Sequence, residues 1–281
     1  MPEEHSPTPG SPDVGLVGSV AVVTGGAQGI GFASGRLLGE CGARVLLADL
    51  DLKAAERAAE DLVSSGCDAI CTAVDVRDAD SVEAMIGLAV DRWGQLDVLV
   101  NSAGVATTEV VAETSEADWR RVLDVNLTGA FLCCRAALAP MTSRGRGRII
   151  NVASVAAKRT SFNASAAYTA SKAGLVAFTR HLGYEVARDG ISVNAICPGP
   201  TVTPMMEQVA TPETLEARRR QVPRGRLLTP DDQARAVLFL ASDLADMICG
   251  VALDVDGGAL LGWTDVDSYL ERRRASRGVQ A

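Results

Sequence analysis

The chain has 281 residues, of which 47% are hydrophobic, with a formal net charge of −8 and a pI near 4.9. This length suits one large α/β domain or two small ones. The acidic balance argues against nucleic acid or an anionic membrane as a partner, and no apolar run approaches the roughly 20 residues that cross a bilayer.

Residues 1–15 are expected to form a disordered tail, because they are rich in proline and lack the apolar core of a secretory signal. Without such a signal, the seven scattered cysteines indicate reduced thiols in a cytoplasmic protein. Cys67 and Cys71 could be half of a metal site, but no second pair completes it, so no metal is expected. The only histidines are His5 and His181, which argues against a histidine-based hydrolase triad.

Short apolar runs then alternate with longer amphipathic segments. The runs are rich in Val, Ile and Leu, as buried parallel strands should be, and they predict strands at Ser19–Thr24, Arg44–Asp49, Ile70–Val74, Val98–Asn101, Arg148–Val152, Ser192–Ile196 and Val251–Val255. Helices are predicted near Gly31–Cys41, Lys53–Ser64, Ser81–Trp93, Ala117–Met141, Ala167–Asp189 and Pro230–Ser242. This alternation predicts a Rossmann-type, doubly wound parallel sheet of seven strands in a single α/β domain, over residues 16–262.

The longest segment without strong periodicity is 199–228. It follows a predicted strand at the carboxyl edge of the sheet, where a lid over a ligand would lie. Residues 263–281 form a C-terminal extension. Its Glu271–Arg274 run is expected to be a solvated helix end, with contact to a neighbouring subunit as the alternative.

A glycine-rich turn, Thr24-Gly-Gly-Ala-Gln-Gly-Ile-Gly31, joins the first predicted strand to a helix. Its glycines let the backbone approach a pyrophosphate at the helix N-terminus. Asp49 ends the second strand, where a carboxylate can accept hydrogen bonds from the adenosine ribose and repel a 2′-phosphate. Gln28 supplies no cation for that phosphate. These features favour NAD over NADP; the alternative is that Asp49 only begins the following turn.

Tyr168 and Lys172 lie four residues apart in a predicted helix and therefore share one face. A lysine ammonium beside the phenol is expected to lower the pKa of that phenol toward the working range. This spacing is common, and alone it would also suit a helix surface. Ser154 ends the fifth predicted strand, where its hydroxyl could hold a substrate oxygen; Ser161 and Ser165 are the competing serines.

Four motifs thus follow one another along the chain: Gly25-x-x-x-Gly29-x-Gly31, Asn101-Ser-Ala-Gly104, Ser154 and Tyr168-x-x-x-Lys172. Their order and approximate spacing resemble those of the short-chain dehydrogenase/reductases, over nearly the whole chain. The resemblance implies hydride transfer between a nicotinamide and a carbinol carbon, with Tyr168 as general acid in reduction and general base in oxidation. It also implies that Asn126 holds a water linking Lys172 to solvent. The alternative for Asn126 is a structural hydrogen bond with a neighbouring carbonyl.

The resemblance further implies the cofactor contacts, with Asp75 and Val76 at the adenine and Thr201 and Thr203 at the nicotinamide amide. The complete set is Gly25, Gln28, Gly29, Ile30, Gly31, Asp49, Asp75, Val76, Asn101, Ala103, Gly104, Tyr168, Lys172, Pro198, Gly199, Thr201 and Thr203. The chain departs from the family in two places. Ser102 replaces the usual asparagine, and the spacing from Ser154 to Tyr168 is one residue longer than the commonest, so a residue is expected to loop out within Lys158–Ser165.

The substrate is expected to be a small-molecule alcohol or ketone. The run Arg218–Arg220 is interpreted as the solvated face of a lid helix, and recruitment of a carboxylate or phosphate is the alternative. Lys158 and Arg159 follow Ser154 closely and are better placed to meet a polar substrate. Arg226 is expected to be structural.

Other activities stay open. A 3-oxoacyl-carrier-protein-type reductase is the alternative enzyme, but such reductases usually prefer NADPH and carry basic residues at the end of the active-site helix, where this chain has Arg188 followed by Asp189. A non-catalytic dinucleotide-binding regulator could share the fold, yet would not need Ser154, Tyr168 and Lys172 together. Sugar-nucleotide epimerases share the Tyr/Lys pair but usually have larger substrate domains. Family resemblance also implies a homo-oligomer, a tetramer or dimer, packed through the two longest predicted helices.

Overall fold

The computed structural model describes residues 14–161, 163–207, 210–262 and 265–278. Its centre is a seven-stranded sheet in the order β3-β2-β1-β4-β5-β6-β7, in which every neighbouring pair is parallel. The strands are β1 (Val20–Thr24), β2 (Arg44–Asp49), β3 (Ala69–Ala73), β4 (Val98–Asn101), β5 (Gly147–Val152), β6 (Ile191–Pro198) and β7 (Ala252–Val255). The doubly wound parallel sheet predicted from the sequence is confirmed. The tail predicted for 1–15 lies, except for its last two residues, outside the described part of the chain.

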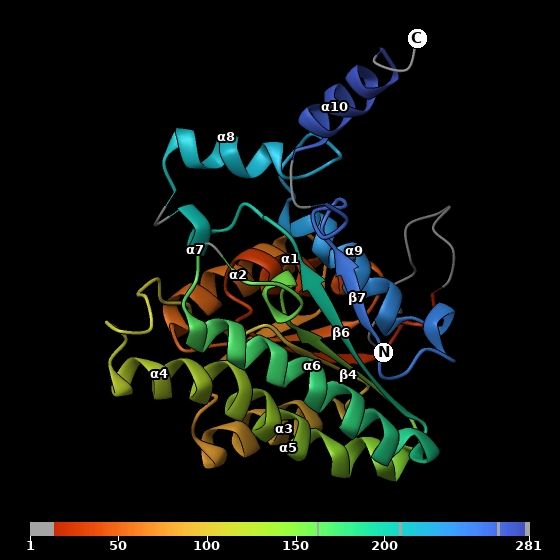
Figure 1. The fold of residues 1–281 in the computed structure, drawn as a ribbon. Coiled ribbons are helices and arrows are strands. Elements are labelled where there is room, and N and C mark those ends of the chain that lie inside the picture. The colour runs from red at the N-terminus through yellow and green to blue at the C-terminus, as the bar shows by residue number, and fades with distance from the viewer. Residues whose placement is uncertain (1–13, 162, 208–209, 263–264, 279–281) are drawn as a thin grey trace.

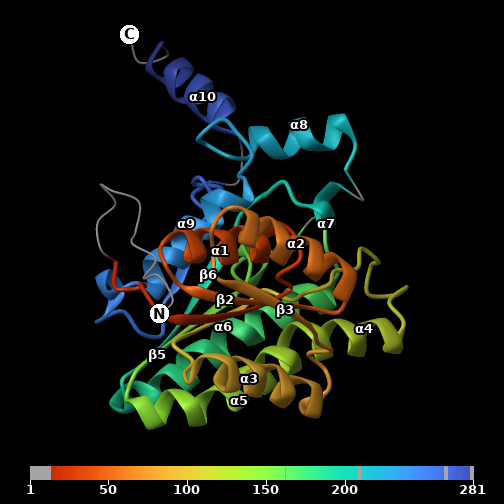
Figure 2. The same ribbon diagram turned by 180° about the vertical axis from the view of Figure 1, so that it is seen from behind.

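Helices cover both faces of the sheet (Figures 1 and 2). They are α1 (Gly29–Glu40), α2 (Leu52–Ser64), α3 (Ala79–Trp93), α4 (Glu116–Leu123), α5 (Gly129–Arg144), α6 (Ala166–Val186), α7 (Pro204–Glu207), α8 (Pro212–Arg220), α9 (Pro230–Ala241) and α10 (Val266–Gly278). Local signals set several ends: the Asp51 carboxylate caps α2 by accepting from the Ala54 N–H at 3.1 Å, and Gly94, with φ +78°, ends α3.

Two hydrophobic layers hold the helices to the sheet. Helices α1, α2 and α9 pack on one face, where Leu38, Leu62 and Val237 join the strand side chains. Helices α3, α5 and α6 pack on the other face, through residues such as Met85 and Met141. Burying one such side chain contributes about 1.5–3 kcal/mol. The central strands β1, β4, β5 and β6 are buried throughout, which explains why apolar residues dominate their sequences.

Two of the strands predicted as buried are partly exposed instead. They are β3 and β7, which form the two edges of the sheet and have a neighbour on one side only. Leu253 of β7, for example, is 37% exposed. Apolar content alone cannot distinguish an edge strand from a central one, because the strand order follows from long-range pairing.

The predicted helix Ala117–Met141 is longer than expected and contains a π-helical turn, Asp124–Thr128, between α4 and α5. By length and composition alone, the continuous helix Glu116–Arg144 could cross a membrane, a test that buried helices of globular proteins also pass. Its side chains Leu132, Cys133 and Met141 nevertheless lie in the core under the sheet.

The order of the strands creates the crevice in which a ligand can bind. From β1 the chain continues to β2 and β3 on one side, and β4 then pairs with β1 on the other. Loops that leave the carboxyl ends of β1 and β4 therefore diverge, which opens a crevice at this edge of a parallel sheet. The Thr24 hydroxyl bridges the two loops by accepting from the N–H groups of Ser102 and Ala103 at 3.2 and 3.3 Å.

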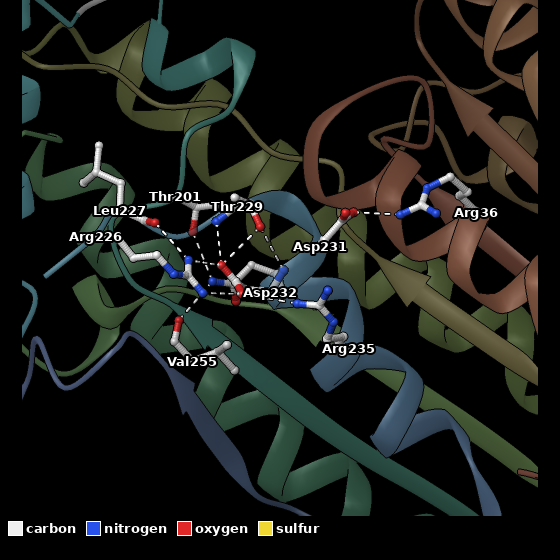
Figure 3. A network of polar contacts seen from close by, with 10 residues as sticks. Arg36, Thr201, Arg226, Leu227, Thr229, Asp231, Asp232, Arg235 and Val255 are labelled. Carbon is white, nitrogen blue, oxygen red and sulfur yellow. Dashed lines mark hydrogen bonds and ion pairs between the residues drawn. The ribbon is translucent and has the colours of Figure 1, made fainter. Parts of the chain in front are cut away.

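The segment predicted as a lid, 199–228, contains the short helices α7 and α8 above this edge (Figure 1). Its two ends meet in a parallel bridge between Thr201 and Leu228. Figure 3 shows the polar contacts at this base: the Arg226 guanidinium pairs with Asp232 at 2.6 Å, as the structural role predicted for Arg226 requires. Buried Gln233 donates from Nε2 to the Thr201 hydroxyl at 3.0 Å.

Candidate active site

A cavity of about 620 Å³ lies at the carboxyl edge of the sheet. Its walls come from the loops after the first six strands, from the start of α6 and from the lid. Of the residues predicted as catalytic or cofactor-binding, it is lined by Gly25, Gln28, Gly29, Ile30, Asp49, Asp75, Val76, Ala103, Gly104, Ser154, Tyr168, Lys172, Pro198, Gly199, Thr201 and Thr203. Segments far apart in the sequence thus share one cavity.

The glycine loop after β1 is shaped by close backbone contacts. A Cβ on Gly25, which has φ +63°, would lie 2.8 Å from the backbone of Ala103, and one on Gly31 would lie 2.1 Å from the Gly25 carbonyl oxygen. Helix α1 then begins at Gly29 without a side-chain cap and without an acid in its first turn. Its first N–H groups can therefore bind an anion in the cavity.

Asp49 reaches from the end of β2 toward the glycine loop. Its carboxylate accepts from the Ala27 N–H at 3.1 Å and from the Asp51 N–H at 3.2 Å. Each oxygen keeps a lone pair for a further donor. The carboxylate lines the cavity, so a hydroxyl could bind there and a phosphate would be repelled.

Ser154 and Tyr168 face each other in the half of the cavity beyond β5. Ser154 is buried, and its hydroxyl accepts from the Ala156 N–H at 3.0 Å. Tyr168 follows the cap of α6, Ser165, whose hydroxyl accepts from the Tyr168 N–H at 3.4 Å. Burial raises the pKa of the Tyr168 phenol, and a hydrogen bond with the Ser154 side chain acts in the opposite direction.

Lys172 lies one turn further along α6 and is buried. Its ammonium donates to the Val152 carbonyl at 2.8 Å and lies 5.7 Å from the centre of the Tyr168 ring. The expectation that Lys172 lowers the pKa of Tyr168 is wrong for this arrangement. Loss of hydration dominates at the phenol, while burial also lowers the pKa of Lys172 itself to about 8.

Three predicted site residues lie behind the cavity wall. Gly31 packs against the Gly25 carbonyl, and the Asn101 side chain donates to the Asn151 Oδ1 at 2.9 Å. Asn126, in the π-helical turn, accepts from the Val105 N–H at 2.8 Å and donates to the Val105 carbonyl at 2.9 Å. These contacts match the structural alternative for Asn126.

Asn126 is nevertheless close to the lysine. A Cβ on Gly104 would lie 3.3 Å from the Asn126 Oδ1 and 3.5 Å from the Lys172 Nζ. The loop after β4 thus packs between the side chains of Asn126 and Lys172. Gly104 permits this close packing because it has no side chain. Asn126 therefore fixes the part of the wall that Lys172 touches.

The residues around Ser154 only partly follow the sequence-based expectation. Lys158 turns away from the cavity to bind the Asp254 carboxylate of β7 at 2.5 Å, because this acid lies beside it. Arg159 does line the cavity, and its guanidinium donates to the Ala259 carbonyl at 2.8 Å. Further lining residues had no signal in the sequence that would have indicated them: Val105, Thr108, Arg121, Asn163, Met205, Met206 and Gln221.

The buried lysine gives a pH-dependent prediction for stability. The pKa of Lys172 is about 8 in the folded protein, against an ordinary value of 10.5. Between these two pH values the unfolded chain binds more protons than the folded chain, so the free energy of unfolding rises with pH. Below this range, the full cost of the buried charge is present. Lys172→Met removes the cost, so the advantage of the variant over the wild type should shrink by about 3 kcal/mol from pH about 7 to pH about 10.5.

Urea unfolding of the cofactor-free protein at both pH values would measure this difference. Lys53→Met is the control, because Lys53 lies on the surface of α2. A stability difference between Lys172→Met and wild type that stays constant with pH would show that the lysine is not desolvated as the structure indicates.

Comparison with known proteins identifies the family of this chain. A family model described as "Enoyl-(Acyl carrier protein) reductase" matches residues 25–259. The chain is 42% identical over 240 residues to cis-4-hydroxycyclohexanecarboxylate dehydrogenase of Sinomonas cyclohexanicum, covering 85% of this chain and 95% of that protein. It is 35% identical over 248 residues to a 3-oxoacyl-[acyl-carrier-protein] reductase of Synechocystis sp., covering 88% and 98%.

Among solved structures, levodione reductase superposes with a TM-score of 0.83 at 30% sequence identity, covering 88% of this chain and 99% of that one. The match extends through the glycine loop, the β4 loop and the α6 motif, which are the segments that form the cavity. The chain belongs to the short-chain dehydrogenase/reductase family, oxidoreductases of alcohol and ketone groups that use a nicotinamide dinucleotide.

Proposed function

We propose that the protein is an NAD-dependent oxidoreductase that interconverts a secondary alcohol and a ketone on a small molecule. The observation that carries this proposal is the single cavity that joins the glycine loop and Asp49 to Ser154, Tyr168 and Lys172. A dinucleotide site and a proton-transfer site are thereby connected. Within the family, the cis-4-hydroxycyclohexanecarboxylate dehydrogenase and the levodione reductase support a free small-molecule substrate.

The residues of the cavity fit a dinucleotide. The uncapped start of α1 and the close-packed glycines suit a pyrophosphate, and Asp49 suits a ribose with a free 2′-hydroxyl. Asp75 and Val76 would hold the adenine, while Thr201, Thr203 and Lys172 would hold the nicotinamide half. When bound, the cofactor supplies the hydride in reduction and accepts it in oxidation.

The chain's own residues then move the proton. In reduction, the Tyr168 hydroxyl donates its proton to the carbonyl oxygen, and the Ser154 hydroxyl donates a hydrogen bond to the same oxygen. In oxidation, the tyrosinate accepts the proton of the alcohol. Lys172 places a positive charge behind the tyrosine, and Asn126 fixes the β4 loop against which Lys172 lies.

Replacing Ser154 by alanine tests this assignment. We expect kcat/KM to fall by about a hundredfold, because the substrate oxygen loses a positioned donor, while NAD binding is retained. Steady-state formation of the reduced nicotinamide and titration with NAD measure the two quantities. Ser161→Ala is the comparison, because Ser161 was the competing serine and also lines the cavity. A larger loss in Ser161→Ala than in Ser154→Ala would reverse the assignment.

Reduction of 3-oxoacyl thioesters on a carrier protein is the second candidate. It is favoured by the description of the matching family model and by the Synechocystis relative. Two features weigh against it. Asp49 opposes the phosphate of NADPH, and Arg188, which could meet an acidic carrier, lies 3.9 Å from the Asp189 carboxylate.

We also propose that the protein acts as a homo-oligomer in the cytoplasm. Exposed apolar side chains on the long helices and on β7 support self-association, including Phe131 and the 91% exposed Tyr184. All seven cysteines are free thiols, as is typical of a reducing compartment.

A further inference from the structure

Most arginines of the cavity are already engaged with the protein. Three of the four that line it have protein partners: Arg77 pairs with Asp75 at 2.6 Å, Arg121 pairs with Asp118 at 3.2 Å, and Arg159 donates to the Ala259 carbonyl at 2.8 Å. The fourth is Arg218, near the end of lid helix α8. Across the described residues it forms no ion pair, and its buried Nε has no hydrogen-bond partner.

The neighbours of Arg218 behave differently, although all three arginines are consecutive. Arg219 and Arg220 are exposed and both bind the Glu216 carboxylate, at 2.6 and 3.0 Å. Successive side chains of an α-helix are about 100° apart. Arg218 therefore turns toward the cavity, while the other two remain at the surface with the acid of this helix.

This arrangement corrects the interpretation of the arginine run as a single solvated face. Arg218 is half-buried, and burial lowers the pKa of its guanidinium. An arginine nevertheless stays protonated in a protein. The lid thus holds a cation that has lost part of its hydration and has an unmade hydrogen bond.

No acid among the described residues lines the cavity from the lid, where this cation lies. Among the lining residues in the described ranges, only Asp49 and Asp75 are acidic. These two acids follow β2 and β3, which lie on one side of β1 in the sheet. The lid follows β6, which lies on the other side. The residues that line the cavity from the lid beside Arg218 are neutral, namely Pro204, Met205, Met206 and Gln221. A bound ligand can therefore supply the anion that the described lining residues beside Arg218 do not.

We infer that Arg218 binds a carboxylate of the substrate, so that the preferred substrates are oxo acids and the corresponding hydroxy acids. This inference rests on the proposed function and narrows its substrate class. A planar guanidinium matches a carboxylate through two parallel hydrogen bonds, and a neutral, partly dry surrounding strengthens the pair. The carboxylate would lie under α8 while the carbonyl lies between Ser154 and Tyr168.

A phosphate of the cofactor is the other possible anion. The structure favours the substrate, because the part of the lid beside the glycine loop is its beginning. A Cβ on Gly29 would lie 3.7 Å from Thr203 and 3.8 Å from Pro204, whereas Arg218 belongs to the next helix. The two sources predict different results for NAD affinity, so one experiment can separate them.

The test compares acids with their methyl esters. For 4-oxocyclohexanecarboxylate and 4-oxopentanoate, Arg218→Gln should lower kcat/KM by about thirtyfold, mostly through KM, because the charged pair is lost. For the methyl esters, the change should stay below about threefold. Arg218→Lys should recover part of the loss for the acids. Arg220→Gln is the matched control, because it removes an adjacent charge outside the cavity.

Calorimetry gives a readout that does not need turnover. NAD-saturated wild type should bind cyclohexanecarboxylate about tenfold more tightly than cyclohexanecarboxamide, and Arg218→Gln should abolish this preference. Equal affinity for acid and amide in the wild type would overturn the inference. So would a fall in NAD affinity of Arg218→Gln as large as the loss for the acids, which would assign Arg218 to the cofactor. Failure of the proposed function would appear separately, as a wild type that binds NAD and the acid but turns over none of the alcohols or ketones.

Discussion

Tyr168→Phe is expected to lower kcat by about a thousandfold and to change NAD affinity by less than about tenfold. The ring still fills its place at the start of α6, but the hydroxyl opposite Ser154 is lost. Only that hydroxyl can exchange a proton with the substrate oxygen in the proposed arrangement. Single-turnover kinetics with NADH and a ketone, together with NAD titration, would measure both effects.

The same helix offers a matched control. Tyr184 lies further along α6 and is 91% exposed, so Tyr184→Phe should leave turnover unchanged. If Tyr168→Phe turned over nearly as fast as Tyr184→Phe, Tyr168 would have no part in the mechanism.

The wild type should also show a pH dependence with a defined sign. Because burial raises the pKa of Tyr168, the phenol is protonated at neutral pH, which suits reduction. Alcohol oxidation needs the tyrosinate and should accelerate as pH rises.

Asp49→Asn should change the ratio of kcat/KM values for NAD and NADP by about a hundredfold in favour of NADP. The carboxylate at the end of β2 would repel a 2′-phosphate, and asparagine keeps the size and one oxygen for the Ala27 N–H while removing the charge. The kcat/KM values for NAD and NADP can both be measured with a single alcohol as the substrate.

Asp51→Asn is the control for this change. Asp51 is the next acid, caps α2 and does not line the cavity, so its substitution should leave cofactor preference unaltered. If Asp49→Asn kept the same preference as the wild type, the alternative interpretation of Asp49 as a turn residue would stand.

Local sequence signals predicted the parallel sheet and the glycine-rich turn between β1 and α1 well. The central strands are mostly apolar, and the predicted bounds of β2 and β4 agree with the structure to the residue. Ser154, Tyr168 and the glycine loop meet because all follow carboxyl ends of parallel strands or lie on a helix that starts there. Such placement depends on chain order, which the sequence displays directly.

The lid illustrates what the sequence pattern did not show. Helix α8 starts at a capping box of Thr211 and Thr214, with Pro212 after the cap. This start signal is present in the sequence, but the helix is too short to show an amphipathic periodicity. The direction of Arg218 depends on the rotation of that helix over the cavity. The pKa of Tyr168 likewise depends on burial by distant segments, so the shift predicted from the neighbouring Lys172 had the wrong sign.

The oxidation of secondary alcohols with NAD in this cavity is tested most directly by the formation of reduced nicotinamide. The wild type would be assayed with NAD and with NADP, across hydroxy acids, polyols, hydroxysteroids and hydroxyacyl thioesters. We predict NADH and one equivalent of ketone from a free secondary alcohol, at a higher kcat/KM with NAD than with NADP. Binding of NAD without reduction by any alcohol, or activity confined to hydroxyacyl thioesters with NADP, would contradict the proposed function.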